Sequence, residues 1–184
     1  KSAINFPEIM ANKKILLVDL SKGKIGEENS NFLGLILVPR ILQAALGRAS
    51  KLGKEEFPNF YLYVDEFQNF ATEDFAQILS EARKYRLNLI VANQYIAQIE
   101  EKVRDAVFGN VGTMVSFKVG VNDASYLQNE FEPVFDQNDL INLENYNIYC
   151  KMLVDGEYPK PFSAKIPYDP QKFPKNKKVG ALVR

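Results

Sequence analysis

Four short apolar runs, each bounded by polar residues, set the pattern of this chain. They are Ile15–Leu20, Phe60–Val64, Leu87–Ala92 and Thr113–Val119. Short, nearly continuous apolar runs of this kind are typical of strands that are buried on both faces. Because segments with helical spacing lie between the runs, the sequence predicts an α/β fold with a parallel sheet covered by helices on both sides.

Two of the intervening segments show the spacing of a helix with one apolar face. The first is expected to begin in a cap region at 29–31 and to kink at Pro39, and the second to begin at Thr72. The predicted buried positions are Phe32, Leu35, Ile36, Leu42, Ala45, Leu46 and Ala49 in the first helix, and Phe75, Ile78, Leu79 and Ala82 in the second.

The pattern changes after Val119. A short helix is expected to bury Ala124, Leu127 and Phe131, to end before Pro133, and to be followed by one or two turns over 136–143. Residues 146–154 alternate like a strand, Asp155-Gly156 is a turn signal, and 162–166 is the expected hairpin partner. We therefore predict one domain over residues 1–166, and an extended or disordered basic tail over 167–184.

Composition narrows the chemistry. The chain has no histidine and one cysteine, Cys150, which excludes His-based acid–base catalysis, internal disulfides and the common zinc sites, and favours a reducing, cytoplasmic setting. The 23 basic and 23 acidic residues are unevenly spread, with basic ends and an acidic middle. A nucleic-acid-binding domain usually has a broad basic excess, so we expect any DNA contact to be local or made elsewhere. No apolar run approaches the roughly 20 residues that span a bilayer.

The most informative stretch is the apolar run that ends in Asp65 and Glu66. Two adjacent carboxylates at the end of a buried strand are costly to desolvate without compensating partners. In nucleotide-hydrolysing folds, the first acid holds Mg²⁺ and the second polarises the attacking water. The simpler alternative is a strand that leaves the core into a polar loop.

Other polar residues extend this pattern. The next apolar strand ends at Asn93-Gln94, and a parallel sheet would bring its end beside Asp65 and Glu66. An amide there can hydrogen-bond a γ-phosphate or the lytic water. Arg83 is a candidate to contact phosphate from a neighbouring subunit, with Arg104 as the competing candidate, although cations near a helix C-terminus also favour the helix dipole.

A phosphate-binding loop of the form G-x-x-x-x-G-K-[ST] is missing from the sequence. The segment 47–55 has the wrong glycine spacing and Glu55 in place of the hydroxyl, and the segment 23–26 lacks the lysine after its second glycine. Because the chain begins at Lys1 and soon enters an apolar run, we expect it to be the downstream part of a longer protein that carries this loop.

The order of these motifs resembles a known family. ILLVDLSKGKIGEENSNFLG, FYLYVDEFQNF, SEARKYRLNLIVANQYIAQI and VRDAVFGNVGTMVSFKVGVNDASYL are similar to the C-terminal half of the motor domain of HerA/FtsK-type ATPases, in particular the TraG/TraD-like ATPases of conjugative DNA transfer and type IV secretion. The resemblance covers about residues 3–166. It implies a RecA-like core, here partial without the Walker A segment, and a C-terminal β-hairpin.

The resemblance also implies functional roles. Asp65 would be the Walker B acid associated with Mg²⁺, Glu66 the catalytic base, Gln94 the sensor, and Arg83 an arginine acting on a neighbouring subunit. The implied partners are ATP, DNA, a ring of identical subunits that is commonly hexameric, and the secretion or conjugation machinery at the cytoplasmic face of the inner membrane. Without Walker A, this chain alone is not expected to bind ATP normally.

Two alternatives are open at this point. The first is a non-catalytic RecA-like scaffold that joins a secretion complex through its acidic middle and basic tail. The second is an unrelated hydrolase that uses Asp65 and Glu66 as an acid–base pair. The second has little support, because adjacent strand residues point to opposite faces and do not flank one substrate bond.

Overall fold

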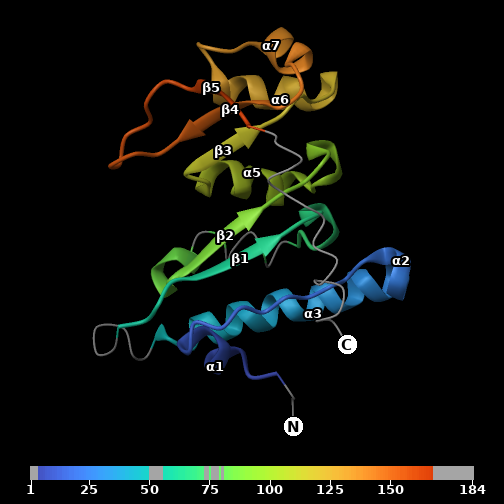
Figure 1. Ribbon diagram of the computed structural model, residues 1–184, viewed down its shortest axis with the longest axis vertical. Coiled ribbons are helices and arrows are strands. Elements are labelled where there is room, and N and C mark those ends of the chain that lie inside the picture. The colour runs from blue at the N-terminus through green and yellow to red at the C-terminus, as the bar shows by residue number, and fades with distance from the viewer. Residues whose placement is uncertain (1–3, 50–55, 73–74, 76–78, 80, 168–184) are drawn as a thin grey trace. The chain divides into compact units, whose positions relative to one another are not determined.

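The computed structural model describes residues 4–49, 56–72, 75, 79 and 81–167. The chain divides into two compact units, residues 1–111 and residues 112–184. Each unit has its own sheet: a parallel pair of strands in the first and an antiparallel three-stranded sheet in the second (Figure 1). The fold is α/β, as the sequence predicts.

The first unit is built on strands β1 (Phe60–Val64) and β2 (Leu87–Val91). The strands pair in parallel, in a register that sets Phe60 opposite Leu87 and Val64 opposite Val91. Parallel pairing places both carboxyl ends at the same edge of the sheet, and Figure 1 shows the two arrows pointing the same way. This unit also contains α1 (Phe6–Ala11), α2 (Lys22–Ile25), α3 (Glu27–Leu46) and α5 (Glu101–Asn110).

One apolar core joins the long helix α3, the two strands and α5. The helix contributes Val38, Ile41, Leu42 and Ala45, all buried, and the strands contribute Val64 and Leu87. Phe75 and Ala82 of the second predicted helix are buried in the same core, and the Phe75 N–H is bonded to the Thr72 hydroxyl as a cap. Of the other two predicted positions, Leu79 is partly buried and Ile78 lies outside the described residues.

Arg48, just past the end of α3, is a buried cation in this unit. Its Nη1 atom donates to the carbonyl oxygens of Pro58 and Tyr85, at 3.2 and 3.0 Å. The guanidinium also lies 5.3 Å from the centre of the Phe57 ring. Burial lowers the pKa of this guanidinium. Arg48 therefore ties the end of α3 to the segments that precede β1 and β2.

Three details of the predicted parallel sheet are wrong. Residues Ile15–Leu20 form no strand, and Ile15 and Leu17 are 89% and 80% exposed. The β1 strand is buried on one face only, because Tyr61 and Tyr63 point to solvent. The predicted strand Thr113–Val119 is shorter and belongs to the antiparallel sheet. The outer face of β1 is exposed because, among the described residues, the apolar core lies against the face that carries Phe60, Leu62 and Val64.

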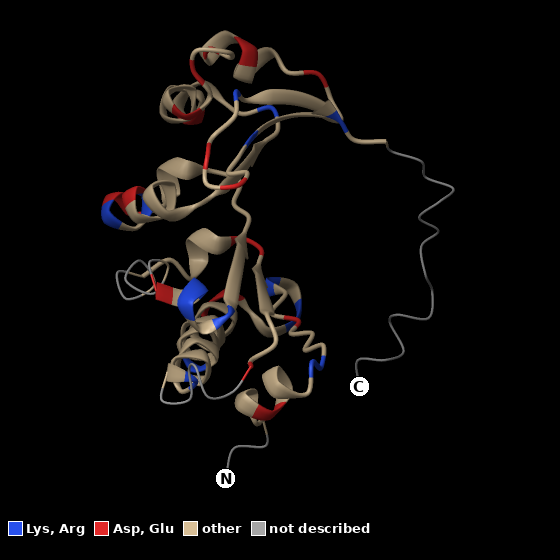
Figure 2. Ribbon diagram, turned by 90° about the vertical axis from the view of Figure 1, so that its left-hand side faces the viewer, with Lys and Arg blue, Asp and Glu red and all other residues tan. Residues whose placement is uncertain are grey.

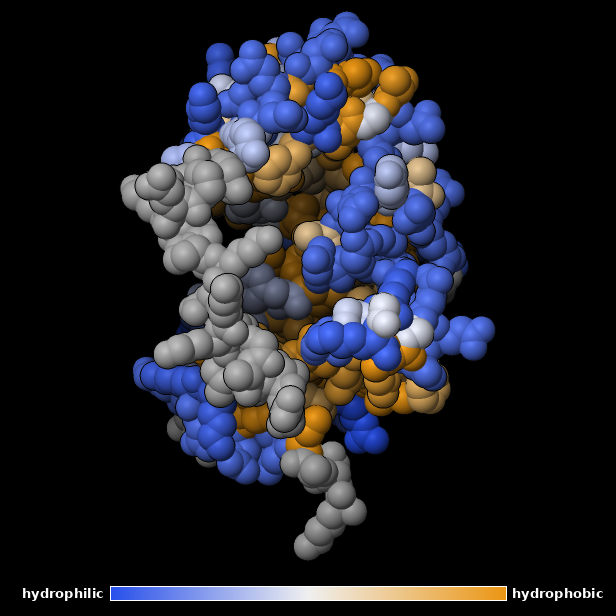
Figure 3. Space-filling model, turned by 45° about the vertical axis from the view of Figure 1, so that its right-hand side comes forward, coloured by the Kyte–Doolittle hydropathy of each residue, from blue (hydrophilic) through white to orange (hydrophobic). Residues whose placement is uncertain are grey.

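The apolar face of α3 also differs from the expected one. The helix begins at Glu27, runs through Pro39, and buries Gly34 and Val38. Four of the apolar side chains on its outer side are 40–62% exposed: Phe32, Leu33, Leu35 and Ile36. Figure 3 shows apolar side chains gathered on the surface of the lower part of the molecule, which is the first unit. This unit therefore exposes more apolar surface than the sequence pattern predicts.

The second unit orders its strands β3 (Thr113–Ser116), β4 (Asn147–Met152) and β5 (Phe162–Lys165) side by side. Its core is formed by α6 (Val121–Phe131), α7 (Gln137–Asn142) and β4. The predicted buried positions Ala124, Leu127 and Phe131 are buried. A capping box between Asp136 and Asp139 begins α7.

The predicted hairpin is confirmed. Strands β4 and β5 pair antiparallel, and Asp155 and Gly156 both have positive φ, at 52° and 87°, as the turn signal requires. The predicted basic tail lies almost wholly outside the described residues. Figure 2 shows basic and acidic residues interspersed in both units. None of the described helices is long and apolar enough to cross a membrane.

Candidate functional site

The candidate site begins in the turn that follows β1. Phe67 is fully buried, its ring centre lies 4.8 Å from that of Phe75, and its N–H donates to the Ala92 carbonyl oxygen at 2.9 Å. This bond extends the ladder between the two strands by one step, because Ala92 N–H in turn donates to Val64 O. Asp65 and Glu66 lie between these two bonded positions, Val64 and Phe67, and Glu66 has a left-handed backbone, with φ 51° and ψ 45°. Phe67 thus fixes the backbone from which the acidic pair projects.

The carboxylate of Glu66 lies between two amides. Gln94, which follows β2, donates from Nε2 to Oε1 at 2.6 Å. Gln68, from the short 3₁₀ helix η2 (Phe67–Asn69), donates from Nε2 to Oε2 at 2.5 Å. The two strand ends therefore lie side by side, as the 28-residue spacing between Glu66 and Gln94 predicts.

Asp65 lies beside this pair and is exposed. Its Oδ1 atom accepts the backbone N–H of Glu66 at 2.9 Å. In the described part of the chain, no group of three or more acidic or cysteine side chains is placed to hold a metal ion by itself. One exposed carboxylate suits Mg²⁺, which commonly binds through one or two carboxylates together with substrate phosphates. The donor set thus fits a metal that arrives with a nucleotide.

The two candidate arginines differ in position and exposure. Arg83 is exposed in η3 (Ala82–Tyr85), just before β2 begins. Since β1 and β2 are parallel, it lies at the opposite end of the sheet from Glu66, one strand length away, roughly 16 Å. Arg104 lies in α5, its side chain is 15% exposed, and it contacts Glu101 and Asp105 at 3.7 and 3.5 Å. Arg83 is therefore the more accessible of the two for a neighbouring molecule.

The glycine-containing segment 23–26 has a local structural role. Residues Lys22–Ile25 form α2, and Gly26, with φ 83°, separates it from α3. The Lys24 ammonium is bonded to the Asp19 carboxylate and lowers the pKa of Asp19 to about 2, with the Ser21 hydrogen bonds contributing further. A lysine engaged in this way agrees with the rejection of the segment as a phosphate loop.

Sequence reasoning missed Gln68. A single polar side chain in a loop carries no pattern that would mark it. In the sequence it is marked only by its position two residues after Glu66, which by itself indicates no contact.

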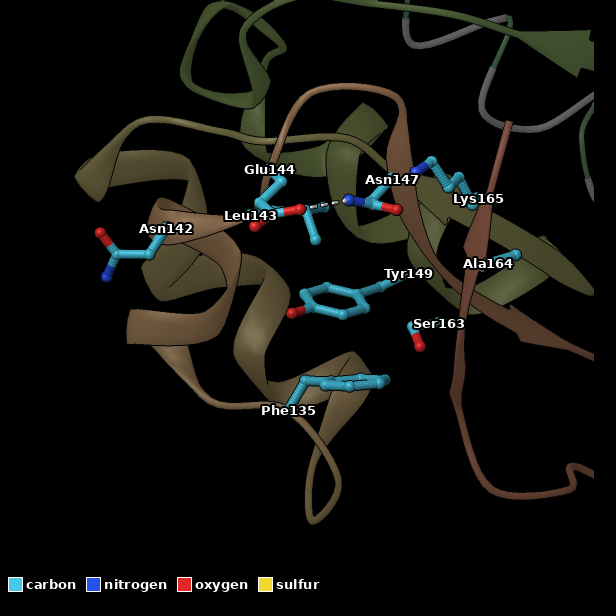
Figure 4. Close-up of a pocket in the computed structure, with 9 residues that line it drawn as sticks. All are labelled: Phe135, Asn142, Leu143, Glu144, Asn147, Tyr149, Ser163, Ala164 and Lys165. Carbon is cyan, nitrogen blue, oxygen red and sulfur yellow. Dashed lines mark hydrogen bonds between the residues drawn. The ribbon is translucent and has the colours of Figure 1, made fainter. Parts of the chain in front are cut away.

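A pocket of about 430 Å³ lies in the second unit (Figure 4). The Phe135 ring stacks on Tyr149, with centroids 3.8 Å apart, and Glu144 accepts a hydrogen bond from Asn147. Burial, and then the nearby carboxylates of Asp139 and Asp136, raise the pKa of Tyr149. None of the predicted site residues lines this pocket.

Comparison with known families supports the resemblance noted above. Residues 59–129 match the family described as the TraM recognition site of TraD and TraG. This segment runs from β1 to α6 and includes Asp65, Glu66 and Gln94. The resemblance to TraG/TraD-like proteins is thereby confirmed for this region. A search of curated proteins gives no significant match.

Two solved structures share the fold. One is the genome packaging NTPase B204 of Sulfolobus turreted icosahedral virus 2, solved with AMPPCP, at TM-score 0.59 and 13% identity over 91% of this chain and 73% of that chain. The other is the bacterial conjugative coupling protein TrwB, without its first 70 residues, at TM-score 0.56 and 14% identity over 77% of this chain. This chain spans 39% of the TrwB structure. The chain shares its fold with these two structures, which agrees with the RecA-like fold that the sequence predicts.

Proposed function

We propose that this chain is the Walker B half of a motor ATPase that hydrolyses ATP to move DNA in conjugative transfer. The observation that carries the proposal is the contact between Glu66 and Gln94, which unites the carboxyl ends of two parallel strands at 2.6 Å. Ligands of open α/β sheets bind at this edge. The TraG/TraD family match over the same residues supports the assignment to DNA transfer.

Each side chain has a role in this proposal. Bound Mg²⁺ would supply charge neutralisation to the phosphates. Asp65 is the residue that would hold the metal, and Glu66 orients the attacking water and accepts its proton. Gln94 would exchange its hydrogen bond to Glu66 for one to the bound nucleotide. Arg83 would act on the site of a neighbouring subunit, which requires the ring assembly.

The exposed apolar surface of the first unit supports a larger parent protein. Soluble proteins seldom leave large apolar surfaces open, and Ile15, Leu17 and several apolar side chains of α3 are exposed. A longer parallel sheet with its helices would cover them. The segment that carries the phosphate loop belongs to this missing part in our proposal.

The partners follow from the same comparison. The matching family is described as a TraM recognition site, so we include a TraM-like protein of the DNA-transfer complex among the expected partners, together with DNA and the secretion machinery at the inner membrane. The motor would work on the cytoplasmic side. These partners are proposals for the parent protein.

ATP turnover by the full-length protein tests the proposal. Replacing Glu66 by Gln removes the proton acceptor and keeps the shape, so we expect kcat to fall by roughly 10²–10⁴-fold. Glu28→Gln, an exposed acid on α3, is the matched control and should leave kcat unchanged. Equal rates for the wild type and Glu66→Gln would refute the catalytic role. They would leave the non-catalytic scaffold as the better reading.

A further inference from the structure

A second amide, Gln68, holds the Glu66 carboxylate from the side opposite Gln94. The two amides reach different oxygens, Oε2 for Gln68 and Oε1 for Gln94. An ionised carboxylate only accepts hydrogen bonds, so both glutamines must present their NH₂ groups to it. The direction of the Glu66 carboxylate is therefore set by two donors on two separate segments.

The two donors differ in their surroundings. Gln68 is half-buried, and its Oε1 atom is buried with no hydrogen-bond partner among the described residues. Gln94 is exposed. Among the described residues, the Gln68 amide bonds only to the carboxylate, so it has no alternative partner there, whereas the exposed Gln94 amide can bond to water instead.

The segment that carries Gln68 is held at both ends. Phe67 before it is bonded to Ala92 and packed in the core, and the Asn69 N–H after it donates to Glu66 O at 3.0 Å. Asn69 also accepts a hydrogen bond from Lys22 at 3.5 Å. Gln68 thus sits on fixed backbone, which is the requirement for a residue that positions another.

We infer that Gln68 is a positioning residue for Glu66. Gln68 holds Oε2 of the carboxylate. When Gln94 releases Oε1 and bonds to another acceptor, the hydrogen bond from Gln68 keeps the Glu66 carboxylate in the same orientation. The expected effect on hydrolysis rests on the proposed ATPase function, whereas the hydrogen bond between Gln68 and Glu66 does not. A misdirected base loses rate without losing nucleotide affinity, because the base acts on water and does not bind the phosphates.

Gln68→Met tests the inference, since it keeps the side-chain length and removes the donor. In the full-length protein we expect kcat for ATP hydrolysis to fall roughly tenfold to hundredfold, while the Kd for a non-hydrolysable ATP analogue stays within about twofold of the wild type. Gln68→Asn is a second variant: it keeps an amide but is one methylene too short. Gln98→Met, at an exposed glutamine of η4 (Ile96–Gln98), is the matched control and should change neither quantity.

A spectroscopic measurement is independent of hydrolysis. In the 184-residue chain, the Gln94 side-chain amide signals in ¹⁵N–¹H NMR spectra should move toward those of Gln98 when Gln68 is replaced by Met. Unmoved Gln94 signals would overturn the inference, as would wild-type kcat in both Gln68 variants of an active protein. If the Gln94 signals move but even the wild type hydrolyses no ATP, the positioning contact is supported and the proposed function fails.

Discussion

Gly34, in the middle of α3, is the described glycine at which an added methyl group would approach its neighbours most closely. A Cβ at this residue would lie 2.0 Å from Phe70 Cε1 and 2.3 Å from Phe70 Cδ1. Carbon atoms in contact normally lie about 3.5–4.0 Å apart. The Phe70 ring packs on the core just after η2, so it has to move by more than 1 Å, as an order-of-magnitude figure, to admit Gly34→Ala.

Two opposing terms decide the sign of the effect. Replacing glycine by alanine inside a helix stabilises by about 1 kcal/mol, because the unfolded chain loses freedom. Overpacking of a core costs about 1–3 kcal/mol, and a 2.0 Å approach to a ring is at the upper end. We therefore expect Gly34→Ala to lower the free energy of unfolding by about 1–2 kcal/mol, which lowers Tm by about 2–8 °C.

Thermal unfolding followed by circular dichroism measures this effect. Gly109→Ala is the matched control, because Gly109 lies in α5 of the same unit and a Cβ there meets nothing within 4 Å. It should raise Tm by about 1–4 °C. In a Phe70→Ala background the obstruction is gone, so Gly34→Ala should become stabilising. If Gly34→Ala in the wild type raises Tm as Gly109→Ala does, the packing argument is refuted.

Three further predictions follow from the same unit. The Asp19 carboxyl should titrate near pH 2 by NMR, and Lys24→Met should return its pKa toward 3.8. Since the pKa is depressed in the folded state, the contribution of this carboxylate to stability is complete above about pH 4 and is lost as the pH falls through about 2. An unchanged Asp19 pKa in the variant would contradict the assigned cause. Arg48→Met should lower the free energy of unfolding by about 1–3 kcal/mol in urea denaturation, because two carbonyl oxygens lose their donor; an unchanged midpoint would contradict this. Phe67→Ala should cost about 3–5 kcal/mol by the same measurement and disturb the Glu66 turn, whereas a loss below about 1 kcal/mol would contradict its place in the core.

The candidate site shows what can be predicted from residues alone. Asp65 and Glu66 stand out because a buried apolar run ends in two acids, and Gln94 because the next such run ends in an amide. Their proximity then follows from one assumption, that the two strands are parallel neighbours, and the structure bears it out at 2.6 Å. Gln68 could not be found in this way, because its reach to Glu66 depends on a left-handed backbone at Glu66 and on the anchor at Phe67.

The fold, like the site, could be predicted only in part from the sequence. The sequence by itself determined three of the four apolar runs as strands, the C-terminal hairpin, and the approximate positions of α3, α6 and α7, because these depend on the spacing of apolar residues and on turn chemistry within a few positions. Tertiary structure alone decided that Thr113–Ser116 pairs antiparallel with β4 and that Ile15–Leu20 stays exposed. An apolar run carries the same pattern whichever neighbour it pairs with, and whether it is buried depends on the surfaces that distant parts of the chain bring to it.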